Sequence, residues 1–377
     1  MATRPLDIEQ EGGLQFYASK LTKATEFVLL GVHFDHALTF KRHVARVAAV
    51  ATRRANMLRC VRAAKLAKNA QALLVLYKGW IRPKIEYASE VYGTFAKTHA
   101  VTLERVQALC LRNILGASKS TPHVILQNEA SVSSLASRRR QQCILSFAKI
   151  MSLPRSHVLQ QTLRHWWRRD IGFEGLMLRP RTFFGQAYHS HNNVFGCPLS
   201  KELAFEFMNP ISLPPWSVFY TPPRKIDIHQ QFRRCLREKV RNLQLRELKN
   251  KHSASWYNSM HPQTRRIWLR CLPPGGVYLR IIARLRSGYT TVGGMLPYMP
   301  EVRCPDCGAV DSVEHLLCSC VAHFERRSKL YDEISNFTTE PLTLSLLLGF
   351  SLSLDSKLLR RITIATARFV IDCKRWP

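Results

Sequence analysis

A group of cysteine and histidine residues in the last fifth of the chain has the types and spacing of metal ligands. Cys304 and Cys307 flank a Pro-Asp pair, and His315, Cys318 and Cys320 follow within a short distance. Thiolates and an imidazole in this order are the donors with which proteins surround a structural zinc ion. The spacing therefore predicts a small zinc knuckle, with Zn²⁺ as a structural cofactor.

A short helix is expected to carry the later ligands. Asp311 has the residue type and position of an N-cap, and Glu314, three residues later, completes a capping box. A helix that starts here presents His315 to the two thiolates. The alternative is that the cysteines are only buried thiols beside a core formed by Leu316 and Leu317.

The identity of the fourth ligand stays open on these grounds. Cys318 lies three residues after His315 and shares its face on a regular helix, whereas Cys320 lies five residues after it and does not. Either cysteine closes the site if the helix ends early.

Composition and charge point to a globular protein with a polyanionic partner. The 377 residues, 46% hydrophobic and 22% charged, are enough for two or three domains with ordinary cores. The net charge is +30, from 56 Lys and Arg against 26 Asp and Glu. Such an excess favours RNA or DNA as a partner over a small-molecule substrate, although a ribosomal protein or one resting on acidic membranes would look similar.

Cysteine usage and hydropathy suggest a reducing compartment. Seven of the eleven cysteines are scattered singly, as buried free thiols are. No apolar run follows the first residues, so no signal peptide is expected, and the longest apolar stretch, 342–354, is too short to span a bilayer. We expect a nuclear or cytoplasmic protein that is not secreted and does not cross a membrane.

Helical periodicity dominates the chain and predicts a mainly α fold. After a polar segment, 1–23, the residues 26–35 favour a strand or hairpin in which Gly31 marks a bulge or a close backbone approach. Four helices with short connections then form a compact basic bundle. We expect them at 40–62 with Thr39 as cap, from Asn69 to a kink or break near Pro83, at 101–115 ending at Gly116, and at 132–151.

The second half divides at a change of composition. Residues 157–226 are rich in proline, glycine and tryptophan and are expected to form an irregular linker. A basic helical region, 227–300, follows and leads into the knuckle at 301–324. Residues 325–377 are expected to form the C-terminal helices of a second helical lobe.

Basic side chains on the helices are the candidate nucleic-acid contacts. Each alone is usually a solvated surface residue, but together they would make phosphate contacts that dominate binding. The candidates are Arg42, Arg46, Arg53, Arg54, Arg105, Arg112, Arg138, Arg139, Arg140, Arg233, Arg234 and Arg237.

The motifs of a complete polymerase or nuclease do not appear in the sequence. Such enzymes use carboxylates that hold two metal ions about 4 Å apart, and the sequence has no Asp-Asp pair, Walker loop or dinucleotide-binding glycine pattern. Asp35 and Glu86 are the acidic residues closest to metal-ligand positions, and both are better explained as turn or cap residues.

Several stretches, in order along the chain, resemble the downstream part of LINE-like (non-LTR, jockey-type) retrotransposon reverse transcriptases. The resemblance covers about residues 24–155 and 280–335. It is carried by Leu30-Gly31-Val32-His33-Phe34-Asp35, Leu76-Tyr77-Lys78, Ile81-Arg82-Pro83, Ile85-Glu86-Tyr87, Leu103-Glu104-Arg105-Val106-Gln107, Ile114-Leu115-Gly116, Ser120-Thr121-Pro122, Arg284-Leu285-Arg286-Ser287-Gly288 and the C-x2-C…H-x4-C order of Cys304, Cys307, His315 and Cys320.

This resemblance implies a role for each part of the chain. Residues 24–37 would form a primer-grip-like strand and turn that includes Gly31, and residues 38–156 a thumb-like bundle that holds the template–primer duplex. The knuckle would contact RNA or target DNA, and its pattern names Cys320 as the fourth ligand.

The resemblance also implies what lies elsewhere. In the family the polymerase aspartates precede the Leu-Gly-Val turn, and many relatives carry a ribonuclease H module that has no counterpart in 157–280. We therefore expect a nucleic-acid-binding fragment without polymerase activity of its own. The alternatives are part of a complete RNA-directed DNA polymerase whose palm is missing from the gene model, and a domesticated protein-interaction module whose partners the sequence does not identify.

Overall fold

The computed structural model describes residues 24–151 except 68 and 93–96, 237–260 except 239, 276–289, and 303–375 except 352, with short pieces at 15–16, 19–20, 156–159 and 161–162. The chain forms two compact units. The first comprises Met1–Val47, Glu86–Thr102 and Leu135–Val240, and the second Ala48–Ile85, Leu103–Ser134 and Arg241–Pro377. The linker expected at 157–226 and the start of the basic region lie almost entirely outside the described residues.

The first unit contains an antiparallel hairpin. Strand β3 (Glu26–Leu29) pairs with β4 (Val32–Asp35), and the shorter pair β1 (Gln15–Phe16) and β2 (Ser19–Lys20) precedes it. Leu30 and Gly31 both have positive φ, of 47° and 80°, so they form the tight turn whose twist suits a hairpin. A Cβ on Gly31 would meet nothing within 4 Å. The expected bulge or close approach at Gly31 is therefore wrong, because the glycine serves the turn.

The hairpin packs on the start of helix α1 (Lys41–Ala63) and on α4 (Ser89–Tyr92). The ring of Phe40 lies edge-on to Phe34, with centroids 5.6 Å apart, and the ring of Tyr92 lies 4.7 Å from that of His43. The Asp35 carboxylate accepts hydrogen bonds from the backbone N–H groups of Thr39 (2.9 Å) and Phe40 (2.8 Å). These bonds stabilise the turn that leads into α1, so Asp35 acts as a turn residue, as the sequence analysis expected.

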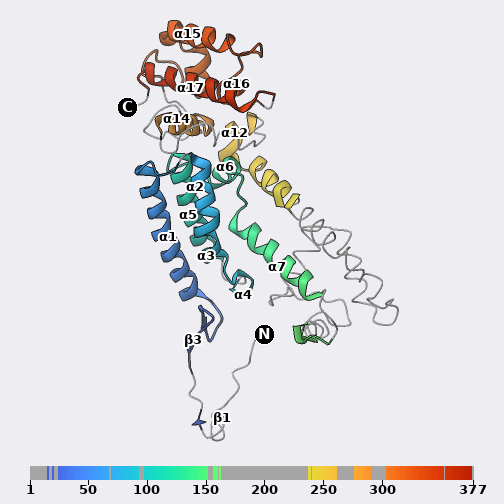
Figure 1. The fold of residues 1–377 in the computed structure, drawn as a ribbon. Coiled ribbons are helices and arrows are strands. Elements are labelled where there is room, and N and C mark those ends of the chain that lie inside the picture. The colour runs from blue at the N-terminus through green and yellow to red at the C-terminus, as the bar shows by residue number, and fades with distance from the viewer. Residues whose placement is uncertain are drawn as a thin grey trace, which may run out of the picture. The chain divides into compact units, whose positions relative to one another are not determined.

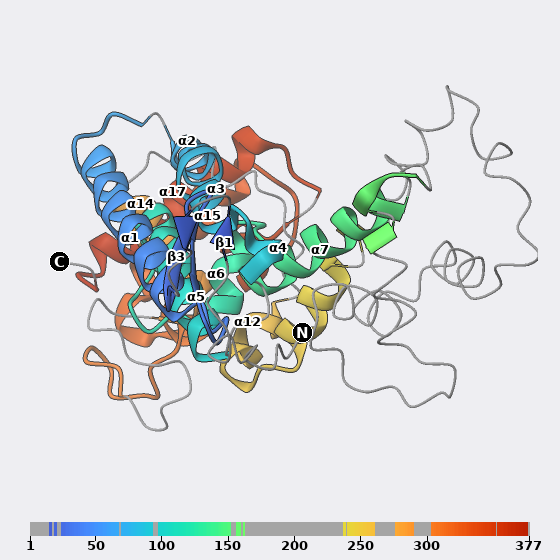
Figure 2. The same ribbon diagram turned by 90° about the horizontal axis from the view of Figure 1, so that it is seen from below.

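Helix α7 (Leu135–Met151) packs on α4 in the same unit (Figure 2). Ser89 donates to Gln142 (2.7 Å), and Arg138 forms a two-pronged ion pair with Glu86 (2.8 and 3.0 Å). Glu86 therefore anchors α7.

The core of the second unit is built from the later part of α1, the α2–η1–α3 helix and α5 (Lys97–Leu115). Helix α2 (Ala70–Leu76) starts at Asn69, whose side chain accepts from the Ala72 N–H, as expected of an N-cap. The apolar positions of the 3.6-residue pattern are fully buried: Ala51, Ala55, Leu58, Leu73, Leu74, Cys110, Leu111 and Ile114.

The helix that follows α2 is not broken at Pro83. It passes through a π turn, η1 (Tyr77–Ile81), and continues as α3 (Arg82–Glu86). Because proline lacks an N–H and crowds the preceding turn, a wider turn before it relieves the conflict without ending the helix.

A buried polar network joins α6 (His123–Glu129), α12 (Ser255–Ser259) and α14 (Val277–Arg286). Glu129 pairs with Arg286 through two hydrogen bonds of 3.1 Å, and both side chains are almost fully buried. Tyr257 donates to Glu129 and accepts from Asn128 (2.9 Å), and burial together with the Glu129 charge raises the pKa of Tyr257 well above its ordinary value. Two further elements precede α12 in the sequence: a helix at 240–249 and the 3-10 turn η4 (His252–Ala254).

Toward the C-terminus, helix α17 (Ser356–Asp372) lies between α15 (Phe324–Ser335) and α14 (Figure 1). Its buried stripe includes Ile362, Ala365 and Phe369, the period expected for this segment. The remaining elements are η5 (His315–Ser319), η6 (Val321–His323) and α16 (Leu344–Leu347).

The fold is mainly α, with hairpins only near the N-terminus of the described chain, as predicted. The fourth predicted helix begins at Leu135 rather than 132, and α6 was not predicted. Among the described residues, no helix has both the length and the apolar character that crossing a membrane would need.

Candidate metal centre

A tight loop brings Cys304 and Cys307 together. The Gly308 N–H donates to the Cys304 carbonyl (2.8 Å), and the Cys304 N–H donates to the Ala309 carbonyl (2.6 Å). Gly308 has φ +75°, a conformation that glycine adopts without strain. The loop therefore turns both thiols to one side.

The next ligand comes from a helix start whose cap differs from the expected one. Ser312 Oγ accepts from the His315 N–H (2.9 Å), so Ser312 is the cap. Asp311 instead forms an ion pair with Arg375, which follows α17, and both side chains are buried. The predicted Asp311–Glu314 capping box is wrong, because Asp311 is committed to this tertiary contact.

The π turn η5 decides which cysteine joins the cluster. The Cys320 N–H donates to the His315 carbonyl (2.7 Å), five residues back. A turn closed by such a bond is wider than a regular one, so residue i+5 returns to the side of residue i. Cys318 instead lies beside Tyr331, with which it forms a hydrogen bond. Burial raises the pKa of the Cys318 thiol.

Four donor atoms converge as a result. The ligand atoms of Cys304, Cys307, His315 and Cys320 lie within 4.8 Å of one another. Cys320 Sγ is 3.9 Å from Cys304 Sγ and 3.8 Å from Cys307 Sγ, and His315 Nε2 is 3.2 Å from Cys307 Sγ. A tetrahedral zinc ion with Zn–S bonds of about 2.3 Å separates two sulfurs by about 3.8 Å. The cluster could therefore hold a metal ion, and its three sulfurs and one nitrogen suit zinc.

The thiols are tuned by their surroundings. The backbone N–H of Ala309 lowers the pKa of Cys307, whereas burial raises the pKa of Cys320 to about 11. Three thiols this close disfavour joint ionisation, and a bound cation reverses that preference by stabilising the thiolates.

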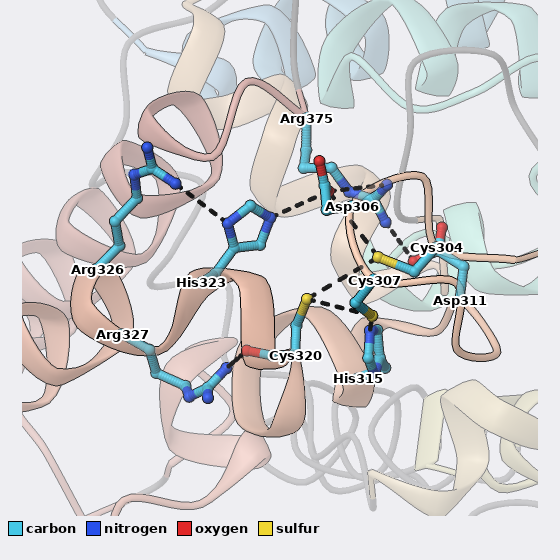
Figure 3. Close-up of polar contacts among 10 residues, drawn as sticks. All are labelled: Cys304, Asp306, Cys307, Asp311, His315, Cys320, His323, Arg326, Arg327 and Arg375. Carbon is cyan, nitrogen blue, oxygen red and sulfur yellow. Dashed lines mark hydrogen bonds and ion pairs between the residues drawn. The ribbon is translucent and has the colours of Figure 1, made fainter.

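Polar and charged side chains around the four candidate ligands form hydrogen bonds and ion pairs with the knuckle (Figure 3). Asp306, between the first two cysteines, accepts from His323 Nε2 (3.1 Å) and lies 3.6 Å from Arg375 Nη1. Arg326 lies 3.3 Å from the other ring nitrogen of His323, and Arg327 donates to the Cys320 carbonyl (2.8 Å). The knuckle is thus bound to α15 and to the chain after α17.

These surrounding residues were not identified from the sequence. The Cys320-x2-His323 spacing signals that a second imidazole lies close to the knuckle. Arg375 gave no such signal, since it lies 64 residues from Asp311 along the chain.

The arginines proposed from the sequence differ in their surroundings. Several are engaged within the protein: Arg42 pairs with Glu26, Arg46 with His33 (2.6 Å), Arg54 stacks over the Trp80 ring (5.2 Å), Arg112 donates to the Thr121 carbonyl (3.0 Å), Arg138 pairs with Glu86, and Arg139 is buried. Arg53, Arg105, Arg140 and Arg237 are exposed, and Arg233 and Arg234 lie outside the described residues.

Comparison with known proteins relates part of the chain to a reverse transcriptase. It is 32% identical over 105 residues to the "RNA-directed DNA polymerase from mobile element jockey" of Drosophila funebris. The match covers 28% of this chain and 12% of that protein, so the chain corresponds to a small part of this relative. No family model matches the chain, and no solved structure matches it.

Proposed function

We propose that this chain is a nucleic-acid-binding part of a non-LTR retrotransposon reverse transcriptase. The observation that carries the proposal is the similarity of 105 residues to the RNA-directed DNA polymerase of a mobile element. The net charge of +30 supports it, because neutralising nucleic-acid phosphates requires such an excess of cations.

In this proposal the first unit contributes the hairpin and the second most of the bundle and the metal centre. The β3–β4 turn at Leu30 and Gly31 would act as a primer-grip-like element, and exposed arginines such as Arg53 and Arg140 would contact phosphates. Cys304, Cys307, His315 and Cys320 would hold zinc, which would contribute folding free energy to this part of the chain.

Binding is tested with the purified chain and three fluorescently labelled probes: an RNA–DNA hybrid, single-stranded RNA and double-stranded DNA. We expect anisotropy titrations to give binding to at least one probe, with log K falling steeply against log salt. An absence of binding to all three probes at low salt would refute the proposal.

A protein-interaction role is the second candidate, favoured by exposed apolar side chains in and beside the knuckle. Val310, Val321 and Phe324 are 65%, 76% and 66% exposed. Exposed apolar groups of this size mark contact surfaces in some proteins. A stoichiometric protein partner that persists after nuclease treatment, with no nucleic-acid binding in the titrations above, would favour this role.

A further inference from the structure

Arginines from two helices far apart in sequence meet at the carboxyl end of α5. Arg62 of α1 donates from Nη1 to the Asn113 carbonyl in the last turn of α5 (2.7 Å). The side chain of Arg280, on α14, lies over Gly116, since a Cβ at that glycine would come within 2.5 Å of Arg280 Cγ. The close approach places both arginine side chains at one helix end.

One further arginine extends this group, which we call the α1–α14 arginine cluster: Arg59, three residues before Arg62 on α1, joins Arg62 and Arg280. Burial lowers the pKa of Arg62, and the charges of Arg280 and Arg59 lower it further. The charges that lower the pKa of Arg62 are therefore those of two other cations, Arg280 and Arg59.

Part of this charge has a structural explanation. The carboxyl end of a helix carries about half a negative charge, and Arg62 satisfies one of its free carbonyls. The three guanidinium groups of the cluster exceed what one helix end can neutralise. Arg280 Nε is buried and has no hydrogen-bond partner among the described residues. Repulsion between half-buried like charges is screened less than at an open surface, so the arrangement is costly unless an anion compensates it.

We propose that the α1–α14 arginine cluster binds a phosphate group of a nucleic-acid backbone. A guanidinium group offers parallel N–H donors that match phosphate oxygens, so adjacent arginines hold such an anion better than lysines do. This inference rests on the proposed function and deepens it, because it assigns one contact to a defined place. The sequence analysis did not single out these three arginines.

The test compares two variants that each lose two positive charges. The cluster variant is Arg59→Gln with Arg280→Gln, which leaves the Arg62 bond to α5 intact. The matched control is Lys357→Gln with Arg360→Gln, two exposed residues on α17. Dissociation constants for a labelled RNA–DNA hybrid are measured from about 50 to about 300 mM salt, a range in which phosphate contacts change affinity strongly.

We expect the cluster variant to bind about tenfold more weakly at about 100 mM salt, with the slope of log K against log salt reduced by about 2. The control is expected to stay within about twofold of the original chain, because screening limits the effect of distant charges. Equal weakening of the two variants would overturn the site, since loss of net charge alone would then explain the result.

A second measurement keeps the site testable if the hybrid does not bind. Tripolyphosphate is expected to raise the Tm of the original chain and of the control, and to raise that of the cluster variant much less. Stabilisation by tripolyphosphate without any nucleic-acid binding would overturn the nucleic-acid assignment and the proposed function together. An equal Tm shift in all three proteins would overturn the site alone.

Folding of the cluster variant is checked by circular dichroism. Because the substitutions relieve repulsion, its Tm at low salt should equal or exceed that of the original chain. Arg280→Lys is the substitute should the double variant misfold: it keeps the charge and loses the paired donors. We then expect an unchanged salt slope with weaker affinity, and unchanged affinity would contradict the proposal.

Discussion

Cys318 and Cys320 are two residues apart but have different surroundings. Cys320 Sγ lies among the other donors, whereas Cys318 contacts Tyr331. We expect Cys320→Ser to abolish stoichiometric zinc binding and destabilise the C-terminal part of the second unit, because three donors leave the tetrahedron open. Metal content by mass spectrometry and thermal unfolding measure the two effects.

Cys318→Ser is the matched control for that experiment. It removes a thiol from the same turn and is expected to retain zinc and to change stability little. Zinc retained by Cys320→Ser and lost by Cys318→Ser would contradict the ligand assignment.

Glu129 neutralises an arginine that is almost fully enclosed. Arg286 also donates to the Leu348 carbonyl (2.6 Å) and stacks on the Phe350 ring (3.7 Å), and its side chain is almost fully buried. Glu129→Ala leaves this charge buried without its carboxylate and should cost about 3–5 kcal/mol of unfolding free energy. Denaturant unfolding followed by circular dichroism measures the loss.

Glu333→Ala provides the comparison, since the Glu333–Arg368 pair is solvent-exposed (3.6 Å). An exposed pair contributes about 0–1 kcal/mol. Similar losses for Glu129→Ala and Glu333→Ala would contradict the description of Glu129 as a buried partner.

At the scale of elements, the end of α5 depends on Gly116. This residue has φ +71°, and an added Cβ would collide with Arg280 Cγ. Gly116→Ala should therefore cost about 1 kcal/mol for the backbone conformation and more for the collision. Thermal unfolding of the single variant tests the sum of the two effects.

A double-mutant cycle separates the two causes. Arg280→Ala removes the colliding Cγ, so Gly116→Ala made in that background should cost only the backbone part. An equal cost in both backgrounds would show that the two residues do not touch.

At the scale of the whole molecule, we propose that the chain binds nucleic acid but does not catalyse nucleotide transfer. Polymerases need carboxylates grouped around two metal ions about 4 Å apart, whereas Glu86, Glu129 and Asp35 are each committed to an arginine or a turn. We expect the purified chain with Mg²⁺ or Mn²⁺ to extend no primer on an RNA template, measured by denaturing gel. Primer extension would contradict this assignment if it persisted after the sample had been freed of nucleases and purified again by affinity chromatography.

Much of the helical fold could be predicted from local patterns. The burial stripe of α17, the Asn69 cap and the stop of α5 at Gly116 all follow from residues close together in sequence. Helix α6 escaped prediction because it is short and buried on nearly every side from Ile125 to Glu129, so it has no amphipathic period.

The candidate sites were predictable to a lesser degree. Their decisive contacts join distant positions, as in the pairing of Glu129 with Arg286, 157 residues apart. Local patterns contain no information on such pairs, and a list of arginines does not say which face solvent, which face an acid and which face one another.

The amino-acid sequence by itself determined the donor types of the knuckle, the positive charge and the periods of the main helices, because these depend on residue identity and near neighbours. The tertiary structure decided that Cys320 rather than Cys318 completes the donor set, and that Arg62 and Arg280 meet at one helix end. The π turn at His315–Ser319, which a regular helical pattern does not predict, set the first outcome, and the packing of distant segments set the second.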